Sequence, residues 1–425
     1  SKYVFTFTAR GVGSSKFAKD YRWGFFPSGA FAWNMKNEPF LKDVKEVSAL
    51  KLRLSAGLTG QQDGIGNYAH LARYNIYIDS YHKYDMGAGN YMGMLGPQAY
   101  DPTIRWETTM TWNMGVDYGF FDNRLSGSID AYVRNTRNLL NSVQIPMGSN
   151  FGNKLMTNVG SIRNQGLEFS INGIPVQTSD LSVHVGFNGT FQSTEFTKLN
   201  PTEDNNYYIE TGTISKGTGG YLCRQMVGYA PYTYFLYKQK YDSDGRPLQN
   251  EFVDLDGDGT ITQADRYMTG KSVSPKFYYG LNLKVTYKDW DFGLNGHGSA
   301  GTWVFNDFAS ANSTSSLDLN SGALPNQARL VRKTGFTAPN SGEQWYSDYF
   351  LENASFFRLD DLNAGYTFRG IGPWESDIRI GASVQNVFVL TGYTGMDPET
   401  VSENGIDNTM WPRPRTWSLR INVNF

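Results

Sequence analysis

The sequence contains a single cysteine and few charged residues, and each shortage excludes a class of protein. Cys223 cannot form a disulfide within the chain, and its place in a predicted connection gives it no expected role. Charged residues make up 18% of the chain and the formal net charge is -2, which excludes the basic surface of a nucleic-acid-binding protein. The mean hydropathy is -0.46, and the absence of any run of about 18 apolar residues excludes a transmembrane helix.

The sequence also lacks the motifs of the common enzyme classes. It has no nucleophile elbow, phosphate-binding loop or zinc motif, so we expect no enzymatic activity. Asp360 and Asp361 are adjacent in a predicted strand, where neighbouring residues point to opposite faces, so this acid pair is not expected to flank one glycosidic bond. The histidines are scattered and are expected to be polar lining or loop residues. They are His70, His82, His184 and His297.

Aromatic residues are abundant instead, at 15% of the chain, and many recur in an alternating pattern that is clearest at the C-terminus. Pro412 and Pro414 keep the start of the last segment, WPRPRTWSLRINVNF, out of a helix. A period of two then predicts a strand with one apolar and one polar face. The apolar face carries Trp417, Leu419, Ile421, Val423 and Phe425, and the polar face carries Ser418, Arg420, Asn422 and Asn424. A terminal aromatic is typical of the lipid–water boundary of a membrane β-barrel.

The same alternation predicts about a dozen strands and therefore an all-β, antiparallel fold, with no convincing long helical period anywhere. The predicted strands lie at Tyr3–Arg10, Trp23–Met35, Leu50–Leu58, Arg105–Phe121, Arg124–Thr136, within Met156–Ile174, at Leu181–Phe191, Phe277–Val285, from Trp290 through Leu294, at Phe356–Phe368, Ile378–Phe388 and in the C-terminal segment. Trp23, Trp290 and Trp374 lie near strand ends, where membrane barrels carry aromatic girdles.

Short and long connections alternate between these strands. Short turns are predicted at 122–123, 175–180, 287–289 and 369–376, and long connections at 61–103, 138–155, 194–274, 301–353 and 391–411. In an up-and-down sheet this places every long connection at one end, which is typical of transmembrane barrels with short periplasmic turns and long extracellular loops. The C-terminus would then be periplasmic. The local pattern alone also fits a large soluble sandwich whose polar faces contact solvent.

An acidic segment at 254–265, inside the connection 194–274, has the ligand spacing of an EF-hand calcium loop. The predicted ligands are Asp254, Asp256, Asp258, Thr260, Thr262 and Asp265. Gly259 occupies the sixth position, where the loop turns sharply, and Asp265 occupies the twelfth, where Glu is usual. The spacing predicts a structural Ca²⁺, with Mg²⁺ as the alternative ion and weakened coordination by Asp265. The competing interpretation is an acidic turn with solvated carboxylates.

The connection 61–103 is rich in tyrosine, and two interpretations of these side chains stay open. The residues are Tyr68, Tyr74, Tyr77, Tyr81, Tyr84, Tyr91 and Tyr100. Exposed aromatic rings can stack on sugar rings or hold peptide side chains. They can equally pack the connection against itself or against a partner protein.

Five segments along the chain resemble one protein family. They are RWGFFPSGAFAWNM at Arg22–Met35, LKLRLSAGLTGQQ at Leu50–Gln62, NVGSIRNQGLEFSI at Asn158–Ile171, DLDGDGTITQADRYMTGKSVSPKFYYGLN at Asp254–Asn282, and the C-terminal WPRPRTWSLRINVNF. In these segments the chain resembles the C-terminal barrel portion of SusC-like (RagA-like) TonB-dependent outer-membrane transporters.

The resemblance implies a barrel of about 22 strands that encloses an N-terminal plug, next to a segment that binds TonB. Neither the plug nor the TonB-binding segment is found in residues 1–425, and Ser1 leads directly into a predicted strand without a signal peptide. We therefore expect the later part of a longer protein, with just over half of a barrel. Since lipid does not tolerate open sheet edges, another chain or residues outside this sequence must complete the wall.

The function that the resemblance implies is TonB-dependent import of a large nutrient across the outer membrane of a Gram-negative bacterium. An oligosaccharide is the first expectation for the nutrient, and an oligopeptide is the alternative. The implied partners are a SusD-like surface lipoprotein that closes over the extracellular loops, TonB, the ligand and outer-membrane lipids, with no nucleic acid. Two rival functions are a secreted, soluble, calcium-stabilised β-rich protein that binds or hydrolyses glycans, and an adhesive outer-membrane barrel.

Overall fold

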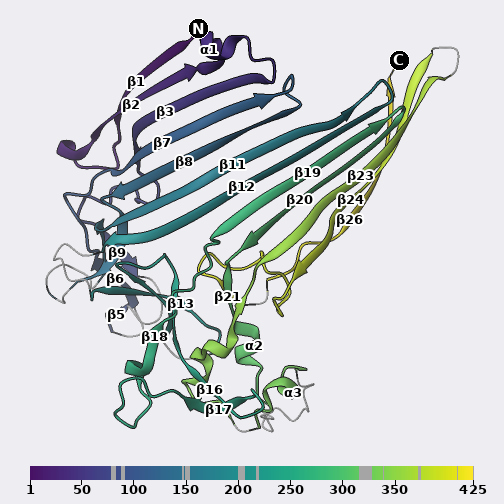
Figure 1. Cartoon of the computed structure of the whole chain (residues 1–425). Helices are drawn as coiled ribbons and strands as arrows, with labels where there is room; N and C mark the ends of the chain where they lie inside the picture. Colours follow the sequence, from purple (N-terminus) through teal and green to yellow (C-terminus); the bar gives the residue numbers. More distant parts are fainter. Residues whose placement is uncertain are drawn as a thin grey trace.

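The computed structural model describes residues 1–77, 83–87, 91–145, 148, 154–199, 206–216, 220–314, 328–337, 339–371, 375–408 and 410–424. Its strands form one large antiparallel sheet, which we call the wall, and several smaller sheets that lie at one end of it (Figure 1). None of the helices that the structure describes is long and apolar enough to cross a bilayer.

The wall contains twelve strands, and each one pairs with the wall strand that follows it in the sequence. They are β1 (Tyr3–Gly13), β2 (Trp23–Asn34), β3 (Val47–Gln61), β7 (Glu107–Phe120), β8 (Leu125–Arg137), β11 (Ser161–Gln177), β12 (Leu181–Lys198), β19 (Phe277–Tyr287), β20 (Trp290–Ala300), β23 (Phe356–Ile371), β24 (Ser376–Thr391) and β26 (Thr416–Asn424). Every predicted strand coincides with one of these twelve, so the predicted strand order is confirmed. Among the described residues no ladder joins β1 to β26, and the wall is open at both.

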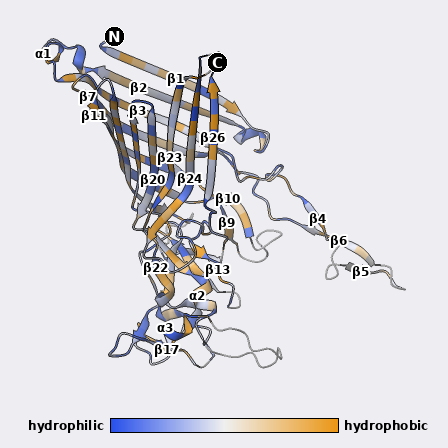
Figure 2. Cartoon of the chain, turned by 90° about the vertical axis from the view of Figure 1, so that its right-hand side faces the viewer, coloured by the Kyte–Doolittle hydropathy of each residue, from blue (hydrophilic) through white to orange (hydrophobic). Residues whose placement is uncertain are grey.

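Strand register sorts the alternating residues onto the two faces that the sequence predicts. Phe31 of β2 lies opposite Leu54 of β3, which lies opposite Met114 of β7. At the other edge Ile380 of β24 lies opposite Ile421 of β26. These residues share an apolar face, while serine, threonine, asparagine and charged residues share a polar face, and Figure 2 shows the alternation along the strands. Phe425 lies outside the described residues.

The connections differ in length at the two ends of the wall, as predicted. The turns at 121–124, 178–180 and 288–289 lie at one end, called the inner end here, and both chain termini lie there too (Figure 1). Asp122 and Asn123 make the first of these turns with positive φ angles of 54° and 62°. Near the N-terminus the alternation of short inner and long outer connections is less regular than expected, because the outer connection 14–22 is shorter than the inner connection 35–46.

The long connections at the outer end fold into small sheets rather than unstructured loops. Their strands are β4 (Tyr74–Tyr77), β5 (Lys83–Asp85), β6 (Tyr91–Pro97), β9 (Leu140–Gln144), β10 (Lys154–Asn158), β13 (Tyr208–Thr213), β14 (Tyr221–Met226), β15 (Thr233–Tyr237), β16 (Gln239–Tyr241), β17 (Pro247–Phe252), β18 (Arg266–Met268), β21 (Trp303–Asn306), β22 (Leu351–Asn353) and β25 (Ile406–Asp407). The sheet β4-β6-β5 extends away from the others (Figure 2).

The helices in the described part of the chain are all short. They are the 3₁₀ helices η1 (Lys19–Tyr21), η2 (Met35–Asn37), η3 (Gln263–Asp265), η5 (Gln344–Tyr346) and η6 (Asp348–Phe350), and the α-helices α1 (Pro39–Lys42), α2 (Asp307–Ala311) and α3 (Val331–Thr334).

The described residues of 206–276, 301–355 and 392–408 form what we call the outer domain, which has its own apolar core. Tyr234, Phe305 and Ile406 are at most 2% exposed at its centre, and they come from three different connections. Burial on this scale explains why the connections are ordered, because side chains of this size gain roughly 1.5–3 kcal/mol each when removed from water. The outer domain is therefore a packed unit that stands over the wall.

One glycine in the wall is enforced by close packing on the apolar face. A Cβ at Gly298 of β20 would lie within 2.6 Å of the Tyr279 ring and closer still to the Phe356 carbonyl oxygen. Gly298→Ala is therefore expected to destabilise the wall by about 1–3 kcal/mol, as overpacking does. The measurement is the fraction of protein that resists unfolding by detergent on heating. Gly29→Ala is the matched control, because its Cβ would meet only the Thr6 carbonyl oxygen, at 4.0 Å. Equal resistance of the two variants would contradict this packing.

Candidate functional site

The acidic loop 254–265 joins β17 to β18 in the outer domain, and three of its four predicted carboxylates converge. Oxygens of Asp254, Asp256 and Asp265 lie within 4.8 Å of one another, whereas Asp258 is not part of this group. The Asp258 carboxylate instead accepts a hydrogen bond from the backbone N–H of Thr260, at 2.7 Å. Three converging carboxylates suit a hard divalent cation, so these residues fit the predicted ligand set in part.

Backbone hydrogen bonds hold the loop in shape. The two oxygens of Asp254 accept from the N–H groups of Gly257 and Gly259, at 2.6 and 2.9 Å. Asp265 is fully buried and accepts from Leu255 and Thr262, at 2.7 and 2.8 Å. Gly257 and Gly259 have φ angles of 76° and 83°, which favour glycine. The curled loop that the spacing predicts is therefore present.

The two best-placed carboxylates differ in their electrostatics. Hydrogen bonds from the Thr262 and Leu255 amides lower the pKa of the Asp265 carboxyl. The Asp258 amide also acts to lower the pKa of Asp256, but desolvation and the charges of Asp258, Asp265 and Asp254 outweigh it, and the pKa of Asp256 is raised. A bound cation would offset this repulsion. The Thr262 hydroxyl accepts from the Ala264 N–H and caps η3.

A buried charge cluster ties the last outer connection, 392–415, to the wall. Its members are His297, Arg358, Asp360, Asn386, Asp397, Glu399 and Arg413, and we call it the Arg358 cluster. Arg358 of β23 is 2% exposed and donates to Asp397 at 2.6 Å and to Glu399 at 3.1 Å. Burial acts to raise the pKa of the Asp397 carboxyl. The hydrogen bond from the Glu399 amide and the charge of Arg358 together outweigh burial, so the pKa of Asp397 is lowered. Buried charges of both signs are thus paired.

Two backbone irregularities in the wall aim side chains at this cluster. The register of β23 with β24 shifts between Leu359 and Asp361, and Asn386 has a positive φ of 52°. The Asn386 amide accepts from Arg358 at 2.5 Å and donates to the Arg413 carbonyl at 2.7 Å. Such bulges re-aim side chains locally. This arrangement anchors the segment that leads into β26.

The bulge also corrects the expectation for the acid pair. Asp360 is the extra residue of the shift and lies 2.6 Å from Nδ1 of His297, a polar-face residue of β20. Asp361 accepts from Asn363, at 2.6 Å, on the same polar face. The two carboxylates therefore do not point to opposite faces as a regular strand would require. Their hydrogen bonds to these neighbours identify them as members of the polar wall.

The remaining predicted residues are spread over both ends of the wall and over the outer connections. Nδ1 of His70 lies 2.9 Å from the Lys16 carbonyl oxygen, and Nε2 of His184 lies 2.9 Å from the Ser182 hydroxyl oxygen. Tyr68, Tyr74 and Tyr84 are each more than 60% exposed, and none belongs to the outer-domain core. Trp23 and Trp290 are 75% and 56% exposed, at the outer and inner ends of their strands. His82, Tyr81 and Trp374 lie outside the described residues, and the side chains of Tyr77 and Tyr91 are not described.

The expectation of a loop position for Cys223 is wrong. Cys223 lies in β14, is fully buried and belongs to the outer-domain core, where burial raises the pKa of its thiol. The strand was missed because β14 shows no alternation of apolar and polar residues. Its thiol is shielded from solvent, which removes it from the candidate site.

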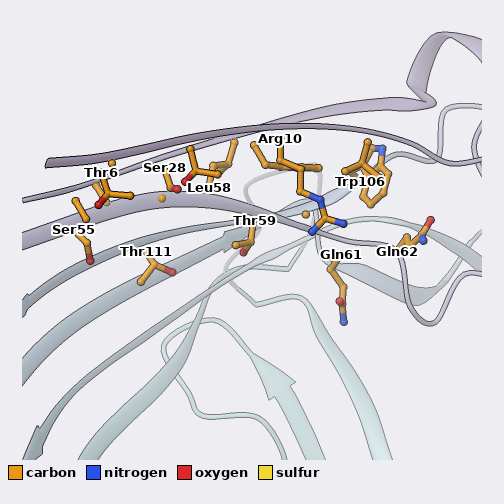
Figure 3. A pocket seen from close by; sticks show the side chains of 18 of the residues that line it. Thr6, Arg10, Ser28, Ser55, Leu58, Thr59, Gln61, Gln62, Trp106 and Thr111 are labelled. Atoms are coloured by element: carbon orange, nitrogen blue, oxygen red, sulfur yellow. The ribbon is translucent and has the colours of Figure 1, made fainter.

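A hollow of about 580 Å³ lies on the polar face at the outer end of β1, β2, β3 and β7, and we call it the wall hollow. Figure 3 shows its side chains, among which Arg10 lies between Thr59 and Trp106 in this view. Its hydroxyl groups come from Thr6, Thr8, Ser28, Ser55, Thr59 and Thr111. The rings of Phe26 and Trp106 pack against each other with their centroids 5.5 Å apart, and they close the outer side of the hollow. Sequence alternation placed these residues on one face but gave no sign of the hollow.

The polar face also carries ion pairs between strands that lie one or two positions apart in the wall. Arg53 of β3 contacts Asp117 of β7 at 2.7 Å and Asp130 of β8 at 2.9 Å. Arg379 of β24 contacts Asp291 of β20 at 2.5 Å. Charges on one side and large apolar residues on the other, both more exposed than in a protein core, indicate a wall between two different media. This pattern, combined with similarity to known proteins, distinguishes a membrane barrel from a soluble sandwich.

A sequence model of the family described as "TonB dependent receptor-like, beta-barrel" matches residues 2–387. The chain belongs to this family. It is 40% identical to the TonB-dependent receptor SusC of Bacteroides thetaiotaomicron over 434 aligned positions, which cover 100% of the chain and 42% of SusC. It is 31% identical to the TonB-dependent receptor P3 of Formosa agariphila, with 100% of the chain and 44% of that receptor covered. The chain therefore spans less than half the length of these relatives.

A solved structure agrees with the chain in fold. The structure titled "Structure of the RagAB peptide transporter" matches with a TM-score of 0.82 and 23% identity, over 100% of the chain and 46% of the matched chain. Family membership confirms the predicted partial barrel and rejects the soluble alternative. Receptors of this family sit in the outer membrane of Gram-negative bacteria, so the apolar face of the wall contacts lipid and the polar face lines the lumen.

Proposed function

We propose that the chain forms the C-terminal part of the wall of an energy-coupled outer-membrane importer whose cargo is an oligosaccharide. The observation that carries the transport role is the polar, hydroxyl-rich lumenal face beneath a folded outer domain, in a chain that is 40% identical to SusC. A wide polar lumen lets a hydrophilic solute cross without entering lipid. The wall itself performs no covalent chemistry. TonB acts through the part of the receptor that lies outside this chain.

The cargo assignment rests on the character of the lumenal face. Serine, threonine, asparagine and glutamine dominate it, and the charges that it carries are mostly paired with each other, such as Arg379 with Asp291. Hydroxyl and amide groups both donate and accept, which suits a neutral polyhydroxylated solute. The second candidate is an oligopeptide, which is favoured by the fold match to the RagAB peptide transporter.

We also propose two features of the outer end. A SusD-like surface lipoprotein covers the outer domain, which supplies a folded surface rather than mobile loops for that contact. The loop 254–265 binds one divalent cation, in first place Ca²⁺, through Asp254, Asp256 and Asp265, with Asp258, Thr260 and Thr262 as further candidate ligands. The cation would stiffen a surface loop and would take no part in transport chemistry. The inner end, with the C-terminus, faces the periplasm.

Deletion of the gene tests the transport role. The mutant strain is expected to lose growth on one class of oligosaccharide as sole carbon source, while growth on the matching monosaccharide, which diffuses through porins, is unchanged. A surface lipoprotein is expected to co-purify with the tagged receptor. Normal growth of the deletion strain on every oligosaccharide and peptide tried, with no lipoprotein in the purified complex, would contradict the proposal.

A further inference from the structure

We propose that the apolar face of the wall carries a binding site for one lipid molecule with a phosphate headgroup, in the leaflet at the outer end. An acyl chain of this lipid lies in a recess on β2, β3, β7 and β8, which we call the lipid-face recess, and the phosphate contacts Arg137 and Arg163. The inference goes beyond the proposed import function. It rests on the contact of this face with lipid and is independent of the cargo.

The lipid-face recess is a hollow of about 600 Å³ on the apolar face. Its lining includes Phe31, Leu54, Ala56, Trp112, Met114 and Val133. Strand register explains the hollow, because Gly29 of β2 lies opposite Ala56 of β3, which lies opposite Trp112 of β7. Two small residues beside a large indole leave a depression, and the side chains of Trp112 and Met114 are 57% and 54% exposed around it. On a face that contacts lipid, an acyl chain fills such a depression.

The recess stays open to the bilayer in a complete barrel. A plug lies against the polar face of the wall, and further wall strands continue the sheet beyond its two edges, β1 and β26. Neither covers the apolar face of β2, β3, β7 and β8. The residues that line the recess all belong to these four strands, so the outer connections do not fill it.

Basic residues follow the recess toward the outer end on the same face. The row of residues beyond Val133 carries Arg163, and the row after it carries Arg137. Lys198 lies in that second row, because Ser161 pairs with both Arg137 and Lys198. Successive rows on one face are two residues apart, so these rows lie about 7 and 14 Å beyond Val133 along the strand. The headgroup layer of a bilayer begins at the edge of the hydrocarbon and is roughly 5–8 Å deep, which matches this separation.

The two guanidinium groups are available to an anion. Arg137 and Arg163 are exposed, and neither forms an ion pair with a carboxylate in the part of the chain that the structure describes. Arg163 donates from Nε to Asn135 at 3.2 Å, which leaves its two terminal nitrogens to a ligand. The carboxylate beside them is that of Glu195, opposite Arg163, so the two rows stay net positive. Guanidinium groups bind phosphate through two parallel hydrogen bonds, and basic patches at the bilayer surface bind anionic headgroups.

The test measures lipid binding to the complete, detergent-purified receptor by mass spectrometry of the intact complex. The probes are phosphatidic acid, diacylglycerol with the same acyl chains, and inorganic phosphate. The wild type is expected to retain one phosphatidic acid with a dissociation constant about tenfold below that for diacylglycerol, because the phosphate adds charge-assisted hydrogen bonds. Inorganic phosphate should not be retained, since it lacks the acyl chain.

Two variants separate the two halves of the site. Arg137→Gln combined with Arg163→Gln should raise the dissociation constant for phosphatidic acid about tenfold and leave that for diacylglycerol unchanged. Ala56→Phe fills the recess, where Gly29 opposite leaves room for the ring, and should raise the dissociation constants of both lipids about tenfold. The control for the arginines is Lys240→Gln combined with Arg246→Gln, on the exposed β16–β17 hairpin of the outer domain. The control for the recess is Ala382→Phe on the apolar face of β24.

Both controls should bind like the wild type. Equal dissociation constants in the wild type and in both site variants would overturn the proposal. So would equal weakening by the Lys240 and Arg246 control, which would mean attraction by overall charge. Diacylglycerol binding as tight as that of phosphatidic acid would assign the recess to an acyl chain without phosphate, such as a lipoprotein anchor. A lipid-free receptor dimer that Ala56→Phe dissociates would assign this face to a second copy of the chain. Either result would overturn the phosphate lipid as occupant.

Discussion

Replacing Arg358 by alanine is expected to release the last outer connection, residues 392–415, from the wall. The change leaves the Asp397 carboxylate, which is only 4% exposed, without its cation, while Glu399 keeps its ion pair with Arg413. Removing one partner of a buried ion pair costs roughly 3–5 kcal/mol, because the remaining charge stays buried and unpaired. The measurement is limited proteolysis of the detergent-purified receptor. Cleavage within 392–415 should accelerate by roughly 100-fold or more, while the wall strands stay protected.

The control for Arg358 is an arginine at the inner end of the same strand. Arg369 also contacts two carboxylates, Asp289 at 2.6 Å and Asp377 at 3.6 Å, but its side chain is 65% exposed. Exposed pairs are screened by water and contribute little. Arg369→Ala should therefore leave the proteolysis of 392–415 unchanged. Equal protection of this connection in Arg358→Ala and wild type would show that the cluster does not hold it.

Removal of divalent cations is expected to loosen the loop 254–265 without unfolding the wall. Calorimetry on the purified receptor should give one Ca²⁺ site with a dissociation constant of about 10⁻⁴–10⁻³ M, the range of weak extracellular sites. Asp256→Ala should abolish the heat of binding, because Asp256 is one of three converging carboxylates and makes the fewest structural bonds of the three. Binding should weaken on acidification, since the raised pKa of Asp256 causes it to protonate before Asp265.

A neighbouring acidic turn gives the matched control for the calcium experiment. Asp244 lies exposed between β16 and β17 and is outside the converging group, so Asp244→Ala should bind Ca²⁺ like the wild type. Asp265→Ala serves a different purpose. It removes the acceptor for the Leu255 and Thr262 amides and should increase proteolysis of the loop even without calcium. An absence of binding heat for the wild type at millimolar Ca²⁺ would show that the segment is an acidic turn that binds no calcium.

The wall could be predicted from the sequence because each of its strands separates two environments. The alternation predicts that residues such as Ile378, Ile380 and Ala382 share one face, and in the structure they lie on the apolar face of the wall. The outer-domain strands carry no such signal. Residues 233–237 of β15 are buried on both sides, so Tyr234 and Phe235 are both in contact with protein and no period of two remains. A strand of this kind cannot be told from a buried loop by pattern alone.

The candidate sites also differ in whether the sequence alone could predict them. The acidic loop is local, so its spacing predicted that Asp254, Asp256 and Asp265 come together, although Asp258 does not join them. The Arg358 cluster and the wall hollow depend on residues far apart in the sequence and on irregular pairing. The bulge at Asp360 and the early end of the β2–β3 ladder at Ser28 follow from packing across strands, which no local pattern records.

Uptake measured in intact cells tests whether this chain belongs to an energy-coupled importer. Wild-type cells and the deletion strain would be supplied with a labelled oligosaccharide that is too large for simple porins, with and without a protonophore that stops TonB from working. We expect accumulation in energised wild-type cells alone, and loss of accumulation in the deletion strain and after protonophore treatment. Accumulation that persists in the deletion strain, or that continues without the proton gradient, would contradict it.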